Sequence, residues 1–346
     1  MDLKNQLLDE WLQKAPAKLY PHNKKIDHYV QYKKLKDYLE TNVHNDVTLG
    51  ANLKDPDILL NDHGPAHIQT VIKRASDLLQ SSKCVLTPFE VYILLCSIEV
   101  HDVGNLFGRV DHEKKAIDVI LNAPNICGRD NIEAKTISTI AETHGGRLND
   151  GSKDKIDNLQ DLESLTHGKI RSKLLASILR FADELADDNT RSNISLLIAS
   201  KLPKKSEVFH AYAHCLQSVT VNQQEHSVEL KFSVPKKFLT RQFGKMGKKV
   251  HLVNEIYERL FKMHLERKYC MSFSRGEIDI DRIRVEIEFY DDKLHNFIPR
   301  MVFFVQDKGY PDMKNDIFHM CPELIVDSVK KDGKYFKKLA TNEKSI

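Results

Sequence analysis

The chain has 346 residues, a formal net charge of +3 at neutral pH, and 41% hydrophobic and 29% charged residues. This composition is ordinary for a globular protein and excludes a collagen, a long coiled coil and a largely disordered chain, while the small net charge argues against a dedicated nucleic-acid coat. The length favours one larger core with a smaller attached domain.

The cysteines and the apolar runs bear on where the protein acts. Six cysteines stand apart without a C-x-x-C pair, which favours reduced thiols over disulfides or a zinc–thiolate site. The longest apolar run, residues 91–100, is too short to cross a bilayer, and residues 1–11 carry acids in place of a signal-peptide pattern. We therefore expect a cytoplasmic protein without a membrane partner.

The first half of the chain places its apolar residues at helical spacing. Short helices are expected between residues 1 and 39. A cap at Asp62 with Pro65 in the first turn predicts the next helix, and the pair Thr87-Pro88 predicts an apolar helix that ends at His101. Further helices are expected from Asp111, from about Asp130 to His144, and from Thr166 to about Asp188.

Beyond about residue 195 the pattern changes. Segments 209–221, 226–234 and 277–291 alternate as strands do, with a helix expected over 250–267 between them. The predicted fold class is therefore mainly α with a smaller C-terminal α+β domain. We expect a helical domain over residues 1–195, an α+β domain over 196–330 and a basic, poorly ordered tail over 331–346.

Several histidines and aspartates lie on the apolar faces of their helices, where an unpaired polar group is costly. Inward-pointing imidazoles and carboxylates from different helices can satisfy one another by binding metal in the interior of a bundle. One such histidine alone is more often a hydrogen-bonded core residue. Taken jointly, the pattern indicates a metal centre formed by His67, His101, Asp102, His112, His144 and Asp183.

The spacing of these residues resembles the HD-domain phosphohydrolase superfamily, whose signature is a His, a His-Asp doublet and a distant Asp. The matching segments are His67-x-x-x-Val71, His101-Asp102-Val-Gly and Leu179-Arg-Phe-Ala-Asp183. HDVGNLFGRVDHE, a later ETHGG and RFADELADDNTRS also resemble the HD-CE subgroup, which occurs in bacterial conflict and stress systems, often with Hsp90-like ATPases. The resemblance covers roughly residues 55 to 195.

The resemblance implies an HD-type helical bundle with two divalent ions. It implies that Asp102 bridges the two ions, and that His112 and His144 bind the second one. The lysine that usually follows the HD-x-Gly turn is Asn105 here, which puts a phosphate contact at this position in question. Mixed His and carboxylate ligation does not distinguish Mn, Fe, Co, Ni, Zn and Mg. The first ion is implied to bind His67, His101, Asp102 and Asp183.

Other residues are candidates for acid catalysis and substrate binding. The segment DHGPAH resembles the Tyr-His-Asn-x-x-His motif of cyclic-nucleotide phosphodiesterases, which implies His63 as a general acid. Equally, His63 or Asp62 caps the following helix. Arg109 and Arg191 are candidates to hold a phosphate, and Asp187 to orient a ligand or a sugar hydroxyl. A solvated surface is the alternative for all three.

The implied activity is metal-dependent phosphohydrolysis of a nucleotide or nucleotide-like phosphoester by metal-activated water, with His63 and Asp102 as catalytic residues. One alternative is an HD-type nuclease on DNA or RNA, for which basic stretches such as 241–249 would bind the polymer. Another is a regulatory module that partners an Hsp90-like ATPase. An intact dinuclear ligand set argues against a purely structural metal.

Overall fold

The computed structural model describes residues 3, 5–15, 27–54, 57, 59, 64–80, 82–123, 130–307 and 316–342. The chain forms two compact units. The first comprises Met1–Pro56, Asp62–Ala186 and Tyr269–Asp279, and the second comprises Asp57–Asn61, Asp187–Lys268 and Ile280–Ile346. The predicted class is confirmed, because the first unit is helical and the second combines helices with a sheet.

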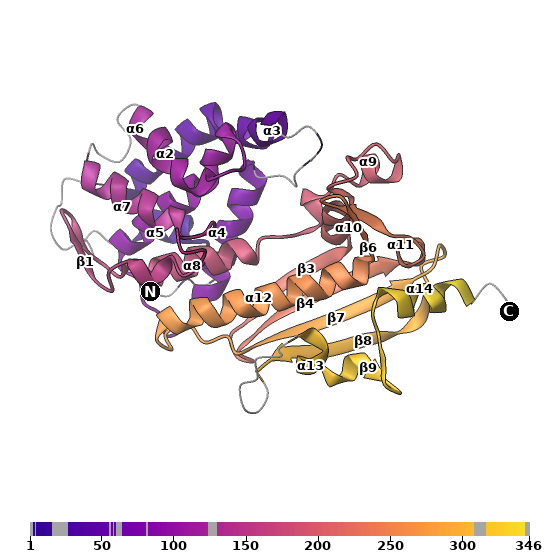
Figure 1. The fold of residues 1–346 in the computed structure, drawn as a ribbon. Helices are drawn as coiled ribbons and strands as arrows, with labels where there is room; N and C mark the ends of the chain where they lie inside the picture. The colour runs from indigo at the N-terminus through magenta and orange to yellow at the C-terminus, as the bar shows by residue number, and fades with distance from the viewer. Residues whose placement is uncertain are drawn as a thin grey trace. The chain divides into compact units, whose positions relative to one another are not determined.

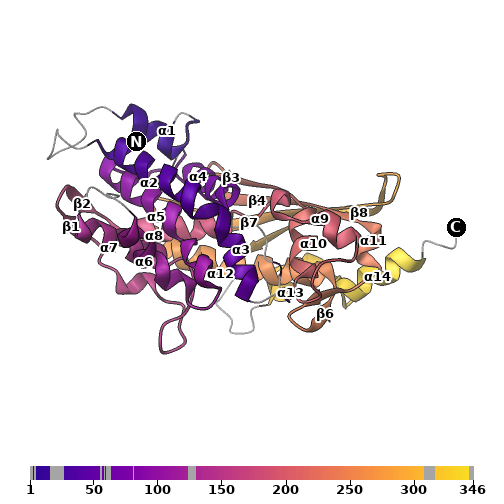
Figure 2. The same ribbon diagram turned by 90° about the horizontal axis from the view of Figure 1, so that it is seen from above.

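The first unit is a bundle built around one apolar helix, α5 (Pro88–Val100), all of whose residues are buried. A helix that is apolar on every side belongs in a core, and α5 contacts α1, α2, α4, α7 and α8 (Figures 1 and 2). The helices of this unit are α1 (Leu8–Lys14), α2 (His28–Asn42), α3 (His44–Lys54), α4 (Pro65–Leu79), α6 (Ala116–Asn122), α7 (Asn131–Glu142) and α8 (Ser172–Glu184).

Local sequence signals fix the start of α5. The side chain of Thr87 accepts a hydrogen bond from the backbone N–H of Glu90, and the Glu90 carboxylate accepts one from the backbone N–H of Thr87. This reciprocal capping satisfies two otherwise unpaired donors, and Pro88 fits the first turn.

No single helix in the described residues is long and apolar enough to span a membrane, although Pro88–Phe107 and His112–Asn122 together form a bent pair of sufficient length and composition.

A short hairpin precedes α8 and corrects the expectation of a helix from Thr166. Strands β1 (Glu163–Leu165) and β2 (Gly168–Ile170) pair antiparallel, and α8 begins only at Ser172. Arg171 lies between hairpin and helix and binds both carboxylate oxygens of Glu90, with Nε at 2.8 Å and Nη2 at 3.0 Å. This bidentate pair joins the amino-terminal ends of α5 and α8.

The second unit contains a four-stranded sheet in the order β3-β4-β7-β8, in which β4 and β7 are parallel and the other pairs antiparallel. The helix α12 (Leu252–Ser274), which belongs to this unit as far as Lys268, runs along one face of the sheet (Figure 1). Its Tyr257 contacts Phe303 of β8. The strands are β3 (Leu216–Asn222), β4 (Ser227–Pro235), β7 (Arg282–Tyr290) and β8 (Asn296–Gln306), with smaller hairpins β5 (Phe243–Lys245) with β6 (Lys248–Val250) and β9 (Ile325–Val326) with β10 (Val329–Lys330).

Two expectations for the second half are wrong. The first part of segment 209–221 is helical, because α10 covers Glu207–Cys215 and only the remainder forms β3. The expected poorly ordered tail contains α14 (Gly333–Asn342), which buries Phe336 and Ala340 at helical spacing. In both places a helix packs its apolar residues inward, which outweighs the local pattern. The remaining helices are α9 (Ile194–Ile198), α11 (Lys236–Leu239) and α13 (Ile317–Met320).

Candidate metal centre

The carboxyl end of α5 carries the His-Asp doublet. His101 is the C-cap of α5 and is fully buried, and Asp102 begins the 3-10 turn η2 (Val103–Phe107). Gly104 in this turn lies so close to the next segment that an added Cβ would be 1.8 Å from the carbonyl oxygen of His112. The glycine therefore permits η2 and the following turn η3 (His112–Lys115) to approach each other.

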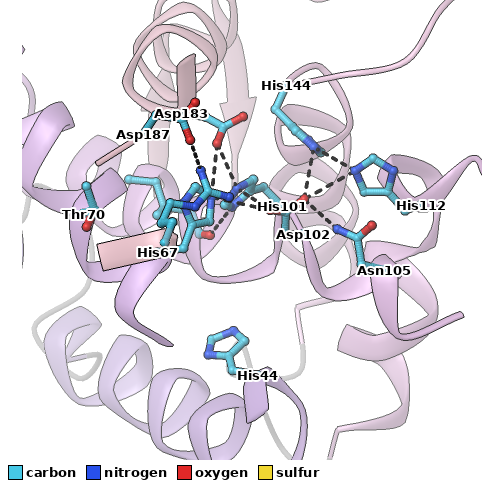
Figure 3. A network of polar contacts seen from close by, with 12 residues as sticks. His44, His67, Thr70, His101, Asp102, Asn105, His112, His144, Asp183 and Asp187 are labelled. Carbon is cyan, nitrogen blue, oxygen red and sulfur yellow. Dashed lines mark hydrogen bonds and ion pairs between the residues drawn. The ribbon is translucent and has the colours of Figure 1, made fainter. Parts of the chain in front are cut away.

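One carboxylate oxygen of Asp102 faces two histidines. Its Oδ2 lies 3.5 Å from Nε2 of His67 on α4 and 3.4 Å from Nε2 of His101. Asp183 on α8 faces the same two nitrogens, with Oδ1 at 3.2 Å and 3.6 Å. We call His67, His101, Asp183 and Oδ2 of Asp102 the first subsite (Figure 3).

The other oxygen of Asp102 faces a second pair of histidines. Its Oδ1 lies 3.4 Å from Nε2 of His112 and 3.6 Å from Nε2 of His144. The two Nε2 atoms are 3.3 Å apart. His112 opens η3, and His144 follows the end of α7. We call these two imidazoles and Oδ1 of Asp102 the second subsite (Figure 3).

Backbone carbonyls orient three of the imidazoles. Nδ1 of His101, His112 and His144 lies 2.7, 3.1 and 2.7 Å from a carbonyl oxygen three residues earlier in the chain. A carbonyl can only accept, so each Nδ1 carries a proton, which leaves Nε2 as the nitrogen that can bind a metal ion. This outer hydrogen bond is the usual support of a metal-binding imidazole. The acceptors belong to Ile98, Arg109 and Ala141.

The donor atoms fit a divalent ion in number and spacing. Nitrogen and oxygen ligands about 2.1 Å from a tetrahedral ion lie roughly 3.4 Å apart, and the contacts here span 3.2 to 3.6 Å. These distances exceed ordinary hydrogen bonds, and the buried Nε2 of His101 makes none. Two groups, His67–His101–Asp102 and Asp102–His112–His144, each bring three donor atoms within 4.8 Å of one another.

The charges differ between the two subsites. Burial opposes the charged form of His101, but Asp102 and Asp183 outweigh it and raise the pKa of His101 well above its usual range. Burial likewise opposes ionisation of Asp183, but His101 and His67 hold the pKa of this carboxyl well below its usual range. Burial lowers the pKa of His144, which is therefore neutral at neutral pH. The first subsite attracts positive charge more strongly.

Comparison with known families agrees with this geometry. The chain matches the HD-CE family over residues 56–242, more than half of its length. The chain belongs to the HD-CE family. No curated protein matches it significantly. HD-CE membership and the His/Asp clusters together indicate an HD-domain protein of the hydrolase type with a divalent-metal site.

Asn105 of this HD-CE protein contacts a proposed metal ligand, which the sequence did not predict. Its side chain is fully buried, and Nδ2 donates a hydrogen bond of 2.9 Å to Oδ1 of Asp102. The amide therefore holds the shared carboxylate in one orientation. A buried side chain bonded in this way is poorly placed to contact a phosphate, in line with the departure noted at this position.

The remaining predicted residues of the first half are placed as follows. Arg109 extends an exposed side chain from the segment between Asp102 and His112, so a phosphate contact and a solvated surface both remain open. His63 and Asp62 lie outside the described residues, and the role of His63 as a general acid stays a prediction. The structure assigns the N-cap position of α4 to Gly64, so the expectation that Asp62 or His63 occupies this position is wrong.

Asp187 and Arg191 belong to the second unit. Nη1 of Arg191 donates to Oδ1 of Asp187 at 2.8 Å, and Nη1 of Arg259 on α12 donates to Oδ2 at 2.7 Å. Two guanidinium groups therefore hold this carboxylate. The partnership with Arg259 was not expected from sequence, and the substrate roles of Asp187 and Arg191 stay predictions.

A third group of potential ligands, Asp130, Glu133 and His167, lies elsewhere in the first unit. Asp130 caps α7 by accepting hydrogen bonds from the backbone N–H groups of Ile132 and Glu133. Nδ1 of His167 pairs with the Glu133 carboxylate and thereby ties the β1–β2 hairpin to α7. These contacts account for the three side chains structurally.

Proposed function

We propose that this HD-CE protein is a metal-dependent phosphohydrolase with one divalent ion in each subsite. The observation that carries the proposal is that the two carboxylate oxygens of Asp102 face different pairs of histidines. Oδ2 faces His67 and His101, and Oδ1 faces His112 and His144. A carboxylate that offers one oxygen to each of two imidazole pairs has the arrangement of a bridging ligand in two-metal hydrolases.

The side chains of this centre bind and orient. Bound divalent ions would lower the pKa of a water molecule from near 16 to about 7 and offset charge on phosphoryl oxygens. Asp183 supplies a second carboxylate only to the first subsite. Asn105 fixes the shared carboxylate, and backbone carbonyls fix three imidazoles, so the donors are aimed before any ion or substrate arrives.

The proposal extends to residues that would handle the substrate. We assign His63 as the general acid that protonates the leaving oxygen, on the strength of the motif in the sequence. Arg109 is exposed on the segment joining ligands from both subsites, which supports a role in gathering phosphate. Asp187 and Arg191, already paired with each other, would hold a sugar hydroxyl and a phosphate.

We propose a nucleotide or nucleotide-like phosphoester as the substrate, because HD-type relatives mostly act on such compounds. The alternative is a nuclease reaction on DNA or RNA, which would show steep salt dependence of binding. Mn, Fe, Co, Ni, Zn and Mg are all compatible with these ligands. Substrate and metal therefore have to be screened together.

The test strips the protein of metal and reloads it with each of the six metals in turn. Each reaction contains one nucleotide mono-, di- or triphosphate, a cyclic mono- or dinucleotide, or a short oligonucleotide. Metal-dependent product formation that Asp102→Ala abolishes is the expected result. The control is Asp118→Ala, which removes an exposed carboxylate of the same unit. Loss of turnover in both variants would contradict the assignment of Asp102.

The setting of the reaction is also a proposal. The HD-CE resemblance supports a role in a bacterial conflict system, in the cytoplasm, beside a protein partner such as an Hsp90-like ATPase. Each of the five described cysteines is a free thiol, which is compatible with a reducing compartment. Two bound ions without turnover of any compound in the screen would favour a partner-activated enzyme or a regulatory module.

A further inference from the structure

A buried carboxylate lies directly behind the second subsite. Glu113 follows His112 in η3 and is only 4% exposed. Its Oε2 lies 3.5 Å from Nδ1 of His112, the nitrogen that donates to the carbonyl of Arg109. The imidazole therefore has a negative charge on the side away from Asp102, where a carboxylate increases the basicity of a ligating histidine and fixes its ring.

A buried ammonium group compensates this carboxylate. Lys155 is 5% exposed, and its Nζ lies 3.6 Å from Oε1 of Glu113 and 3.2 Å from Oε1 of Glu142. Nζ makes no hydrogen bond of ordinary geometry, so it interacts with the carboxylates mainly through its charge. A buried lysine without a full set of hydrogen bonds is costly, which calls for a reason beyond stability.

The two carboxylates belong to the two elements that carry the second subsite. Glu113 adjoins His112 in η3, and Glu142 is the last residue of α7, two positions before His144. The ammonium group of Lys155 lies between them and draws both elements together. Within the described part of the chain, the ion pairs of these three charged residues involve His112 and one another, and no residue that belongs to the first subsite alone.

A glycine makes this arrangement possible. Gly146 has a φ of +72°, and an ideal Cβ at this position would lie 1.8 Å from Oε1 of Glu113. The neighbouring Gly145 is different, because an added Cβ there would meet nothing within 4 Å. Only the second glycine of the pair therefore lets the backbone after His144 lie against the Glu113 carboxylate.

We propose that Glu113 and Lys155 are positioning residues for the second subsite, with Gly146 admitting the Glu113 side chain. They hold His112 and His144 at the separation that a second divalent ion requires. The inference rests on the proposed function, since it presumes an ion in each subsite. Under this proposal, the ligands of the second ion are held in place by residues that do not themselves bind the ion.

The test measures Mn²⁺ binding to the full chain, by titration and by the electron paramagnetic resonance signal of coupled ions. Lys155→Met and Glu113→Gln replace each group by a neutral one of similar shape. We expect the first Mn²⁺ to bind as in wild type and the second to bind roughly 10 to 100-fold more weakly, so that a mononuclear signal replaces the coupled one. Lys114→Met, an exposed neighbour, is the control.

Three further variants separate positioning from folding. The double variant Glu113→Gln/Lys155→Met leaves no buried charge of this pair unbalanced, so it should regain thermal stability without regaining the second Mn²⁺. Arg180 independently binds the carbonyls of Thr143 and Lys153, which keeps the loop anchored. Gly146→Ala should weaken the second ion while Gly145→Ala does not.

The outcomes are distinguishable. Two ions bound with unchanged affinity and coupling in Lys155→Met and Glu113→Gln would overturn the positioning role and leave the proposed function intact. Equal loss of both ions, in step with a lower melting temperature, would reduce the pair to a structural one and also overturn it. A wild-type protein that binds only one Mn²⁺ would remove the dinuclear proposal itself.

Discussion

The two subsites on either side of Asp102 are built in different ways. The first takes His67 and Asp183 from within α4 and α8 and His101 from the C-cap of α5, and it has two carboxylates. The second takes His112 from a 3-10 turn and His144 from the residues after a helix, and shares its single carboxylate with the first. A ligand on a packed helix is held by the core, whereas one on a turn needs local supports. We therefore expect the first ion to bind more tightly.

The largest effect should come from removing Asp102, the ligand that the two subsites share. Asp102→Ala takes one ligand from each, so we expect neither ion at micromolar metal. Hydrolysis should fall below about a thousandth of wild type, because the pKa of unbound water returns from about 7 towards 16. Elemental analysis and the rate measure the two losses. Retention of one ion at full affinity would show that Asp102 serves only one subsite.

Replacing one histidine should affect the binding of the two ions differently, depending on the subsite to which that histidine belongs. His112→Ala should weaken the second ion by at least about 100-fold, since changes outside the ligand shell already cost 10 to 100-fold, and leave the first ion in place. His67→Ala should weaken both, because the second subsite then lacks a neighbour that orders Asp102. Metal titration of both variants checks this, with the exposed His295→Ala as the control. Identical binding curves for the two variants would contradict the assignment of His67 and His112 to different subsites.

The pH dependence should also differ. The pKa of His101 lies well above its usual range without metal, so an ion entering the first subsite displaces a proton. Its affinity should therefore rise with pH, by up to roughly tenfold per unit below that pKa. The pKa of His144 is lowered, so its imidazole is already neutral at pH 7 and the second affinity should change little between pH 7 and 8. Calorimetry in buffers of different ionisation enthalpy counts the protons, and equal release at both steps would contradict this.

The smallest effect should follow from loosening the shared carboxylate. Asn105→Leu removes the 2.9 Å hydrogen bond to Oδ1 of Asp102. A hydrogen bond to a charged group contributes about 1.5 kcal/mol at the lower end of its range, which is appropriate for a carboxylate that metal ions also hold, so we expect roughly tenfold weaker binding of the second ion. The exposed Asn158→Leu serves as the control. Unchanged binding would mean that the metal ions alone orient Asp102.

Periodicity predicted most of the helical unit because its main helices are amphipathic or wholly apolar, and α2, α5 and α7 also begin at residues whose side chains cap them. Thr87 and Pro88, for example, mark the start of α5 as expected. Segment 209–221 misled because aromatic and small residues alternate there, while burial of Val208, Ala211 and Tyr212 on one side decides for a helix. Similarly, Tyr335, Phe336 and Ala340 order α14 within a chain end whose charge favoured disorder.

The residues of the site also differ in whether the sequence could predict them. The residues proposed as ligands could be found because inward-facing His and Asp residues break an apolar pattern, and the structure brings all six together. Asn105, Glu113 and Lys155 could not be found that way. Their partners are fixed by tertiary packing, and Lys155 lies more than forty residues from Glu113, so no local spacing reports the contact.

A carboxylate with one oxygen turned to each subsite has a thermodynamic consequence. Asp102 must adopt a single rotation for both ions, so the ion that binds first would remove the conformational freedom that the second would otherwise have to remove. Binding would then be cooperative, and by reciprocity each ion would increase the affinity for the other by the same factor. The tighter first subsite would then fill first, and its ion would increase the affinity of the second subsite, so the fully loaded protein would form at a lower metal concentration than two independent sites allow.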